Sequence, residues 1–262
     1  MKPKNGITYR KLPGLTTQGV RNWGLMFLLF GMVFNPKIQG AMSGEQATFL
    51  VTTVALILQL LHYCAIPIFV FLFVEGMTHT SDLKKYATRI GIVAVGAQIP
   101  YNLAIYGEWF SFKGLMNFRL NPVFGLLLAM VLLYFYRRYA GKSIKLVLLK
   151  AFLWLMAFMW VKMLRIDYGF PVILLAPIIY FLRKKRMVMI FAGCIALTLC
   201  GFLDTTNGTS YLRTAAYVAS APVSFMVLHF YNGERGEGNR YINYLAYPVM
   251  LIAIGLFAKF AI

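Results

Sequence analysis

Long apolar blocks alternate with short basic or turn-rich segments along the whole chain. Nine blocks are apolar enough and long enough to predict helices, and charges, glycines or prolines mark their boundaries. The predicted helices span residues 22–40, 47–77, 87–106, 121–136, 144–163, 168–182, 187–203, 211–231 and 241–260. An α-helix rises about 1.5 Å per residue and a bilayer core is about 30 Å thick, so most of these blocks have the length of a membrane span. The pattern therefore predicts an all-α fold, a polytopic transmembrane helical bundle with about nine spans.

The two blocks nearest the N-terminus each allow an alternative. The block 47–77 is too long for one straight span, and Pro67 removes a backbone hydrogen bond, so we expect either a kink or an interfacial helix that leads into a span. The block 22–40 follows a basic head and precedes the small residues GAMSG, a pattern that also fits a cleaved signal peptide. The sequence therefore allows both a retained first span and a signal peptide that is removed.

The composition also favours a membrane protein. The 262-residue chain is 60% hydrophobic and 13% charged, whereas a soluble domain is about half apolar and a quarter charged. The net charge of +18 is also typical of nucleic-acid-binding proteins, but here the basic residues form short clusters between apolar blocks rather than one basic surface. We therefore expect contacts with membrane lipid and none with nucleic acid.

The basic residues predict an orientation. Most of the 26 Lys and Arg residues fall in alternate segments between the blocks, and cytoplasmic loops are the ones enriched in these residues. We therefore expect the N-terminus to be cytoplasmic and the protein to be a multi-pass protein of the cell membrane. Residues 1–21 form a basic cytoplasmic segment in this scheme, and 22–262 form a single transmembrane domain.

The cysteines give no sign of a metal site or a disulfide framework. Cys64, Cys194 and Cys200 all lie inside apolar blocks and lack the spacing of metal ligands. Free buried thiols are the simplest interpretation, and we expect no metal.

Glu75 and His79 end the second apolar block in the segment VEGMTHTSDLKKYATR. Residues four apart share a helix face, so the two side chains are expected to be neighbours. One interpretation is a structural pair that ties the second block to the third. The other is catalytic, with His79 as a general base and Glu75 orienting its ring.

Six further polar residues lie within or next to apolar blocks. An ionisable or strongly polar group costs free energy inside a bilayer, so such residues either join helices or line a cavity. The predicted cavity-lining set is His62, Gln98, Tyr101, Asn102, Asn121 and Asp167. Hydrogen bonding between helices is the simpler interpretation for His62, and an N-cap is the simpler one for Asp167.

Several segments, taken in order, resemble the TraX family. They are CAIPIFVFLFVEGMTHTSDLKKYATRI, QIPYNLAIY, NPVFGLLLAMVLLYF, DYGFPVILLAPIIYF, YNGERG and YLAYPVMLI. The resemblance implies an integral membrane protein similar to acyltransferases that take acetyl groups from acetyl-CoA, with family members that acetylate the N-terminal amine of a pilin. It also implies that the basic residues Lys84, Lys85 and Arg89 hold the phosphates of acetyl-CoA at the cytoplasmic face.

The chain departs from the family pattern at four positions that usually carry ionisable groups. An Asp-His pair of the family falls on Gly31 and Met32, an arginine falls on Tyr63, and a C-terminal histidine falls on Met250. Gly and Met side chains do not take up a proton, so the family mechanism does not transfer unchanged.

Three hypotheses follow from these matches and departures. The first is an acyltransferase of altered mechanism that uses His79 and Glu75 and passes an acyl group to an amine or hydroxyl. The second is a catalytically inactive relative that binds a lipid, peptide or partner protein. The third is a transport component, although transporters usually carry paired charges near the bilayer midplane and this chain has few.

Overall fold

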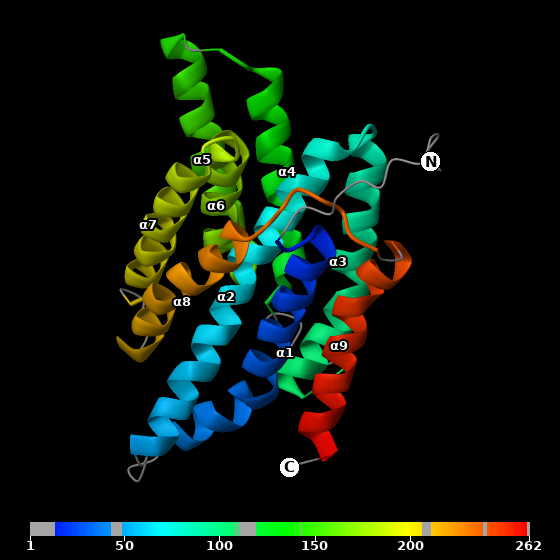
Figure 1. Cartoon of the computed structure of the whole chain (residues 1–262), viewed down its shortest axis with the longest axis vertical. Coiled ribbons are helices and arrows are strands. Elements are labelled where there is room, and N and C mark those ends of the chain that lie inside the picture. The colour runs from blue at the N-terminus through cyan, green and yellow to red at the C-terminus, as the bar shows by residue number, and fades with distance from the viewer. Residues whose placement is uncertain are drawn as a thin grey trace.

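The computed structural model describes residues 14–42, 49–107, 109, 119–141, 143–205, 211–237 and 240–260 (Figure 1). Over these residues the fold is all-α, as the sequence predicts. The nine helices are α1 (Thr17–Met42), α2 (Phe49–His79), α3 (Leu83–Tyr106), α4 (Pro122–Arg138), α5 (Ile144–Met163), α6 (Gly169–Leu182), α7 (Arg186–Thr205), α8 (Tyr211–His229) and α9 (Arg240–Phe260). The largest departure from the predicted ranges is at the start of α1, which begins five residues earlier at Thr17.

Local signals in the sequence explain where two of these helices begin. Asp82 adopts an extended conformation before α3, and its carboxylate accepts a hydrogen bond from the backbone N–H of Lys85. Asn121 caps α4 in the same way through the N–H of Val123, and Pro122 occupies the first helical position, where its missing N–H costs nothing. α3 ends at Gly107, whose positive φ of 73° suits a residue without a Cβ.

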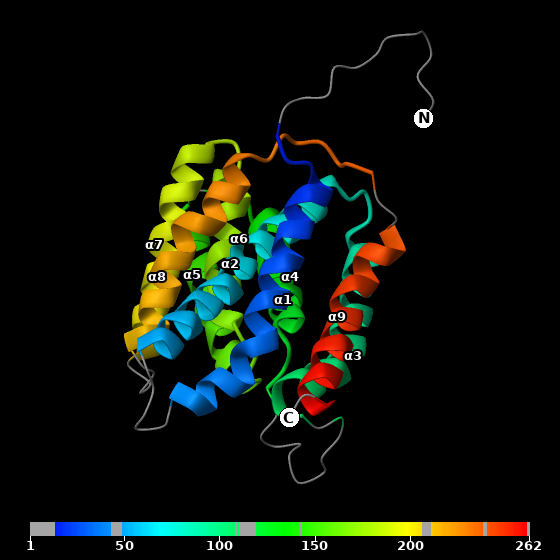
Figure 2. The same ribbon diagram turned by 60° about the horizontal axis from the view of Figure 1, so that its bottom comes forward.

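Helix α2 is the centre of the bundle. It packs against α1, α6 and α8. Its C-terminal half is buried in the bundle, where side chains such as Ile68 and Met77 are inaccessible to solvent. α3 pairs with α9, and α7 pairs with α8. α2 lies between these two pairs (Figure 2). α2 continues as one helix through Pro67.

Three helical segments in the described part of the chain are long and apolar enough to cross a membrane. They are Thr53–His79, Ile144–Met163 and Arg186–Leu203. Shorter apolar helical segments cover Gly169–Leu182, Thr214–His229 and Asn243–Phe257. α5 exposes apolar side chains such as Phe152 and Met159, which is the surface that a helix presents to lipid. These features support a membrane-type helical protein, while the number of nine spans stays a prediction.

The connections between helices separate into two ends of the bundle. The α2–α3, α4–α5, α6–α7 and α8–α9 connections lie at the same end as the start of α1 (Figures 1 and 2). These are the connections that carry the basic clusters used to predict a cytoplasmic face, so we call this end of the molecule the basic end. The end of α3, the start of α4 and the α5–α6 connection lie at the opposite end.

Candidate functional site

A pocket of about 850 Å³ opens at the basic end, between the end of α2, the α6–α7 turn and the segment that follows α8. We call it the basic pocket. Its lining residues are Gly14, Phe71, Glu75, Thr78, His79, Arg183, Lys184, Arg186, Met189, His229, Phe230, Tyr231, Asn232 and Gly233. The pocket therefore contains the Glu75–His79 pair that the sequence singles out, together with two cationic side chains from the α6–α7 turn and one from the start of α7.

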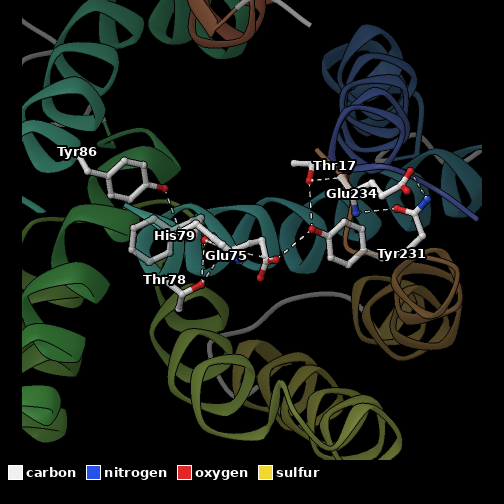
Figure 3. A network of polar contacts seen from close by, with 9 residues as sticks. Thr17, Glu75, Thr78, His79, Tyr86, Tyr231 and Glu234 are labelled. Carbon is white, nitrogen blue, oxygen red and sulfur yellow. Dashed lines mark hydrogen bonds and ion pairs between the residues drawn. The ribbon is translucent and has the colours of Figure 1, made fainter. Parts of the chain in front are cut away.

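The geometry of His79 suits proton transfer. Its Nδ1 lies 3.0 Å from the backbone carbonyl oxygen of Glu75 and 3.6 Å from the Glu75 carboxylate (Figure 3). A carbonyl oxygen only accepts hydrogen bonds, so among the two tautomers of the neutral ring this contact favours the one with the proton on Nδ1. Nε2 then carries the lone pair, and 73% of the His79 side chain is exposed. The backbone carbonyl thus orients the ring directly, and the carboxylate is placed to stabilise the ring once it is protonated.

Tyr231 holds the Glu75 carboxylate from the other side. Its phenol donates a hydrogen bond of 3.0 Å to Glu75 Oε1, and Thr17 Oγ1 lies 3.2 Å from the same phenol oxygen (Figure 3). The Thr17 hydroxyl donates to the backbone carbonyl of Glu234 at 3.1 Å. Burial, together with the charge of Glu75, raises the pKa of Tyr231, so the phenol is neutral and remains a donor near pH 7. The start of α1 and the YNGERG segment are thereby joined to the site.

The three cations of the pocket differ in their contacts. Arg186 donates from Nη1 to the backbone carbonyl of His229 at 2.9 Å and from Nη2 to the carbonyl of Tyr231, so it binds the C-terminal end of α8. Arg183 lies over the ring of Tyr180, at 5.0 Å from its centroid. Among the described residues, no carboxylate forms an ion pair with Arg183 or Lys184. Two exposed cations therefore remain available to an anionic ligand.

The predicted phosphate-binding residues Lys84, Lys85 and Arg89 are absent from the pocket lining. All three are exposed on the first turns of α3, and Lys85 pairs with Asp82 at 3.5 Å. The structure brings Arg183, Lys184 and Arg186 to Glu75 and His79 in their place. In the sequence these residues form the basic cluster LRKKR, for which a topology signal is a simpler interpretation than the binding of anionic lipid. Their contact with α2 depends on tertiary packing.

At the opposite end of the bundle, a second set of polar residues forms the group that we call the Asn121 network. Asn121 is fully buried, and its side-chain amide donates to the carbonyl of Ala94 at 2.8 Å and to Gln98 Oε1 at 2.9 Å. Gln98 Nε2 in turn donates to Asn102 Oδ1 at 2.9 Å and to the carbonyl of Arg119 at 3.0 Å. Of the predicted cavity-lining set, Gln98, Asn102 and Asn121 thus bond to one another and join α3 to the start of α4.

Asp167 and Tyr101 form an adjoining contact. The Tyr101 phenol donates to Asp167 Oδ2, and Arg119 Nη1 donates to Asp167 Oδ1 at 3.1 Å. The negative charge of Asp167 raises the pKa of Arg119, so the guanidinium keeps its positive charge. The interpretation of Asp167 as an N-cap is wrong, because Tyr168 occupies the cap position of α6 and the carboxylate reaches across to α3 and the α3–α4 connection instead.

His62 lies apart from both groups, in the buried middle of α2. Its Nδ1 and Oε1 of Gln59 have no hydrogen-bond partner among the described residues, so the interpretation of His62 as a hydrogen-bonded interhelical residue does not hold for Nδ1. The imidazole packs against the rings of Tyr63 and Tyr168, with centroids 6.0 Å and 5.0 Å away. Gly31 of α1 approaches closely, since a Cβ there would lie 2.6 Å from the His62 Cα.

Two of the positions at which the chain departs from the family pattern meet in one apolar cluster. Met32 is buried with Tyr101 and Leu251, and Met250 packs against the same cluster. Tyr63, at a third such position, stacks on Tyr217 with ring centroids 3.8 Å apart. Three of the four places where the family pattern has ionisable groups are therefore filled here by packed apolar or aromatic side chains.

No group of three or more His, Cys, Asp or Glu side chains that could hold a metal ion occurs within the described ranges. Comparisons with curated proteins and with solved structures gave no match. A family model described as TraX protein matches residues 28–258, which is nearly the whole chain. The chain therefore belongs to the TraX family.

Proposed function

We propose that this protein is a multi-pass acyltransferase of the cell membrane, in which the basic pocket binds the polyanionic end of a cytoplasmic acyl donor of the acetyl-CoA type. The observation that supports the proposal most strongly is the composition of this one pocket. It combines an oriented histidine, His79, with the cations Arg183, Lys184 and Arg186. A charged phosphate ligand and a proton-accepting group would then meet at the same opening.

The cations account for donor binding in this proposal. Guanidinium and ammonium groups bind phosphate oxygens by charge-assisted hydrogen bonds, and Arg183 and Lys184 form no ion pair with a described carboxylate that would compete. Arg186 has two backbone partners already, so we assign it to positioning the segment after α8. The sequence-based alternative, with Lys84, Lys85 and Arg89 as the phosphate-binding residues, is tested in the same experiments.

His79 accounts for the chemical step. Nε2 takes the proton of the attacking amine or hydroxyl as the nucleophile forms a bond to the thioester carbonyl carbon. The carbon–sulfur bond then breaks, and the thiolate leaves and takes the proton from the imidazolium. Glu75 stabilises the transient positive charge on the ring, because its carboxylate lies 3.6 Å from Nδ1.

Two measurements test the proposal. Acetyl-CoA at millimolar concentration should raise the melting temperature of the purified protein, because a ligand that binds only the folded state stabilises it by mass action. Labelled acetyl groups should then be transferred to an acceptor in membranes, and His79→Ala should abolish this transfer while His229→Ala, a change to another histidine of the pocket, leaves most of it. Equal transfer by His79→Ala and the wild type would remove His79 from the mechanism.

A second candidate function is a binding protein without transfer activity. The observation that favours it is the apolar cluster around Met32 and Met250, which occupies positions where the family pattern has ionisable groups. Thermal stabilisation by acetyl-CoA without any label transfer would identify this function. Absence of both effects would reject both candidates.

A further inference from the structure

Two buried polar atoms of α2 lack hydrogen-bond partners within the described part of the chain. They are Oε1 of Gln59 and Nδ1 of His62, and the two residues are 9% and 5% exposed. Residues three apart lie on the same face of a helix, so both atoms belong to one region of the bundle. A buried donor or acceptor that gives up water without gaining a partner destabilises the folded state, which makes two such atoms on one face unusual.

The surroundings of this pair favour a neutral ligand. The His62 imidazole contacts the rings of Tyr63 and Tyr168, and Gly31 of α1 lies against the backbone of His62. No described carboxylate forms an ion pair with His62. Asp167 interacts electrostatically with His62, but its carboxylate is already bound by Tyr101 and Arg119. An ammonium group would therefore lose its hydration without a counter-charge of its own, and a carboxylate would face a like charge. Either costs far more than burying a neutral polar group.

A hydroxyl group has the donor and the acceptor that these two atoms need. Its hydrogen is donated to Gln59 Oε1, which can only accept, and its oxygen accepts from His62 in the tautomer that carries the proton on Nδ1. We propose that Gln59 and His62 form a binding site for the hydroxyl group of an uncharged, largely apolar small molecule. The site is separate from the basic pocket, because Glu75 lies 13 residues further along α2, about 20 Å at 1.5 Å per residue. It does not depend on the acyltransferase proposal.

The three histidines of the chain allow a direct test. Labelling histidine alone with ¹⁵N gives ring signals only from His62, His79 and His229, and the variants His62→Phe, His79→Ala and His229→Ala assign them. The purified protein in detergent is titrated with 1-hexanol, with hexylamine and with hexane. We expect saturable movement of the His62 signal with 1-hexanol, and much smaller movement with the other two. The His79 and His229 signals serve as internal controls for changes in the detergent.

Several outcomes would overturn the site. Equal movement with hexane would mean non-specific apolar partitioning, movement with hexylamine alone would mean that the ligand is a cation, and no movement with any probe would mean that no such site exists. Gln59→Leu should abolish the response to 1-hexanol.

The stability of Gln59→Leu gives an independent readout. Since Gln59 Oε1 has no partner in the absence of a ligand, removing it should raise the melting temperature by about 2–4 °C. A fall in melting temperature would instead mean that Gln59 makes a stabilising hydrogen bond, for example to an internal water, and would contradict the proposal. Gln18→Leu, which removes a glutamine from the first turn of α1, is the matched control and should not produce this rise.

Discussion

The basic pocket and the Asn121 network lie at opposite ends of the bundle, and they differ in how far their polar side chains are bonded to other protein groups. In the Asn121 network, the amides of Asn121, Gln98 and Asn102 bond to one another and to backbone carbonyls, and Asn121 is fully buried. In the basic pocket, His79, Arg183 and Lys184 are exposed, and the two cations have no described ion-pair partner. The difference indicates that the network stabilises the fold, whereas the exposed cations of the pocket can bind a ligand.

The largest effect on folding is expected from Asn121→Ala. The change removes the side-chain bonds to Ala94 and Gln98 and the cap of α4, and it leaves the backbone N–H of Val123 without its acceptor. We expect the free energy of unfolding to fall by about 3 kcal/mol. Unfolding in mixed micelles measures this value. The matched change in the pocket, Lys184→Ala, should alter it by less than about 0.5 kcal/mol, and similar losses in the two variants would break the comparison.

The double variant Arg183→Ala/Lys184→Ala should have the next largest effect, and on binding alone. Each cation near a charged ligand contributes about 1 kcal/mol, so we expect the Kd for acetyl-CoA to rise about 30-fold. Equilibrium binding to the detergent-solubilised protein measures it. Lys84→Ala/Lys85→Ala, which removes two cations outside the pocket lining, is the control and should change the Kd little. A larger loss of acetyl-CoA affinity in Lys84→Ala/Lys85→Ala would instead indicate that the phosphates bind at the start of α3.

Tyr231→Phe should have a smaller effect. It removes the hydrogen bond to Glu75 Oε1 and leaves the ring packed edge-on against Phe71. We expect a loss of about 1 kcal/mol in unfolding free energy, together with slower acyl transfer if Glu75 needs this contact to face the His79 ring. A stability loss with unchanged transfer would assign Tyr231 to structure alone.

The smallest effect concerns the dependence of stability on pH. The pKa of Tyr231 in the folded state is raised above its usual value of 10.0, so this phenol holds its proton more tightly when folded than when unfolded. Its contribution to stability is therefore complete below pH 10 and is lost as the pH rises through the folded-state pKa. Chemical denaturation between pH 8 and about pH 11 should show a steeper loss for the wild type than for Tyr231→Phe. Parallel curves would contradict this prediction.

The helices could be predicted from the sequence because each apolar block carries its own boundaries. The pairing of Glu75 with His79 was also accessible, since residues four apart on a helix are neighbours. The partners across the fold were not accessible: the phenol of Tyr231 reaches Glu75 over 156 residues of sequence, and the α6–α7 turn meets α2 only through tertiary packing. Asp167 was also mispredicted for want of tertiary information. An aspartate just before a helix is usually its N-cap, but here the phenol of Tyr101 on α3 binds the carboxylate instead.

The cytoplasmic orientation of the basic clusters stays a prediction, which the arrangement of the connections makes testable. The connections that carry the basic clusters lie at one end of the bundle, and the cluster between α6 and α7 lines the basic pocket. An acyl donor from the cytoplasm would reach the pocket directly if that end faces the cytoplasm. Cysteine labelling at Lys84 and at Lys184 from one side of the membrane tests this, and labelling of the two positions from opposite sides would contradict the proposed topology.

The most direct test of the proposed function is to follow the three histidine ring signals while acetyl-CoA is added to the ¹⁵N-histidine-labelled protein. His79 and His229 both line the basic pocket, whereas His62 lies buried in the middle of α2. We predict saturable movement of the His79 and His229 signals with no movement of His62, and loss of the response in Arg183→Ala/Lys184→Ala. Movement of His62 alone, or no movement of any signal at millimolar acetyl-CoA, would contradict the assignment of the basic pocket as the donor site.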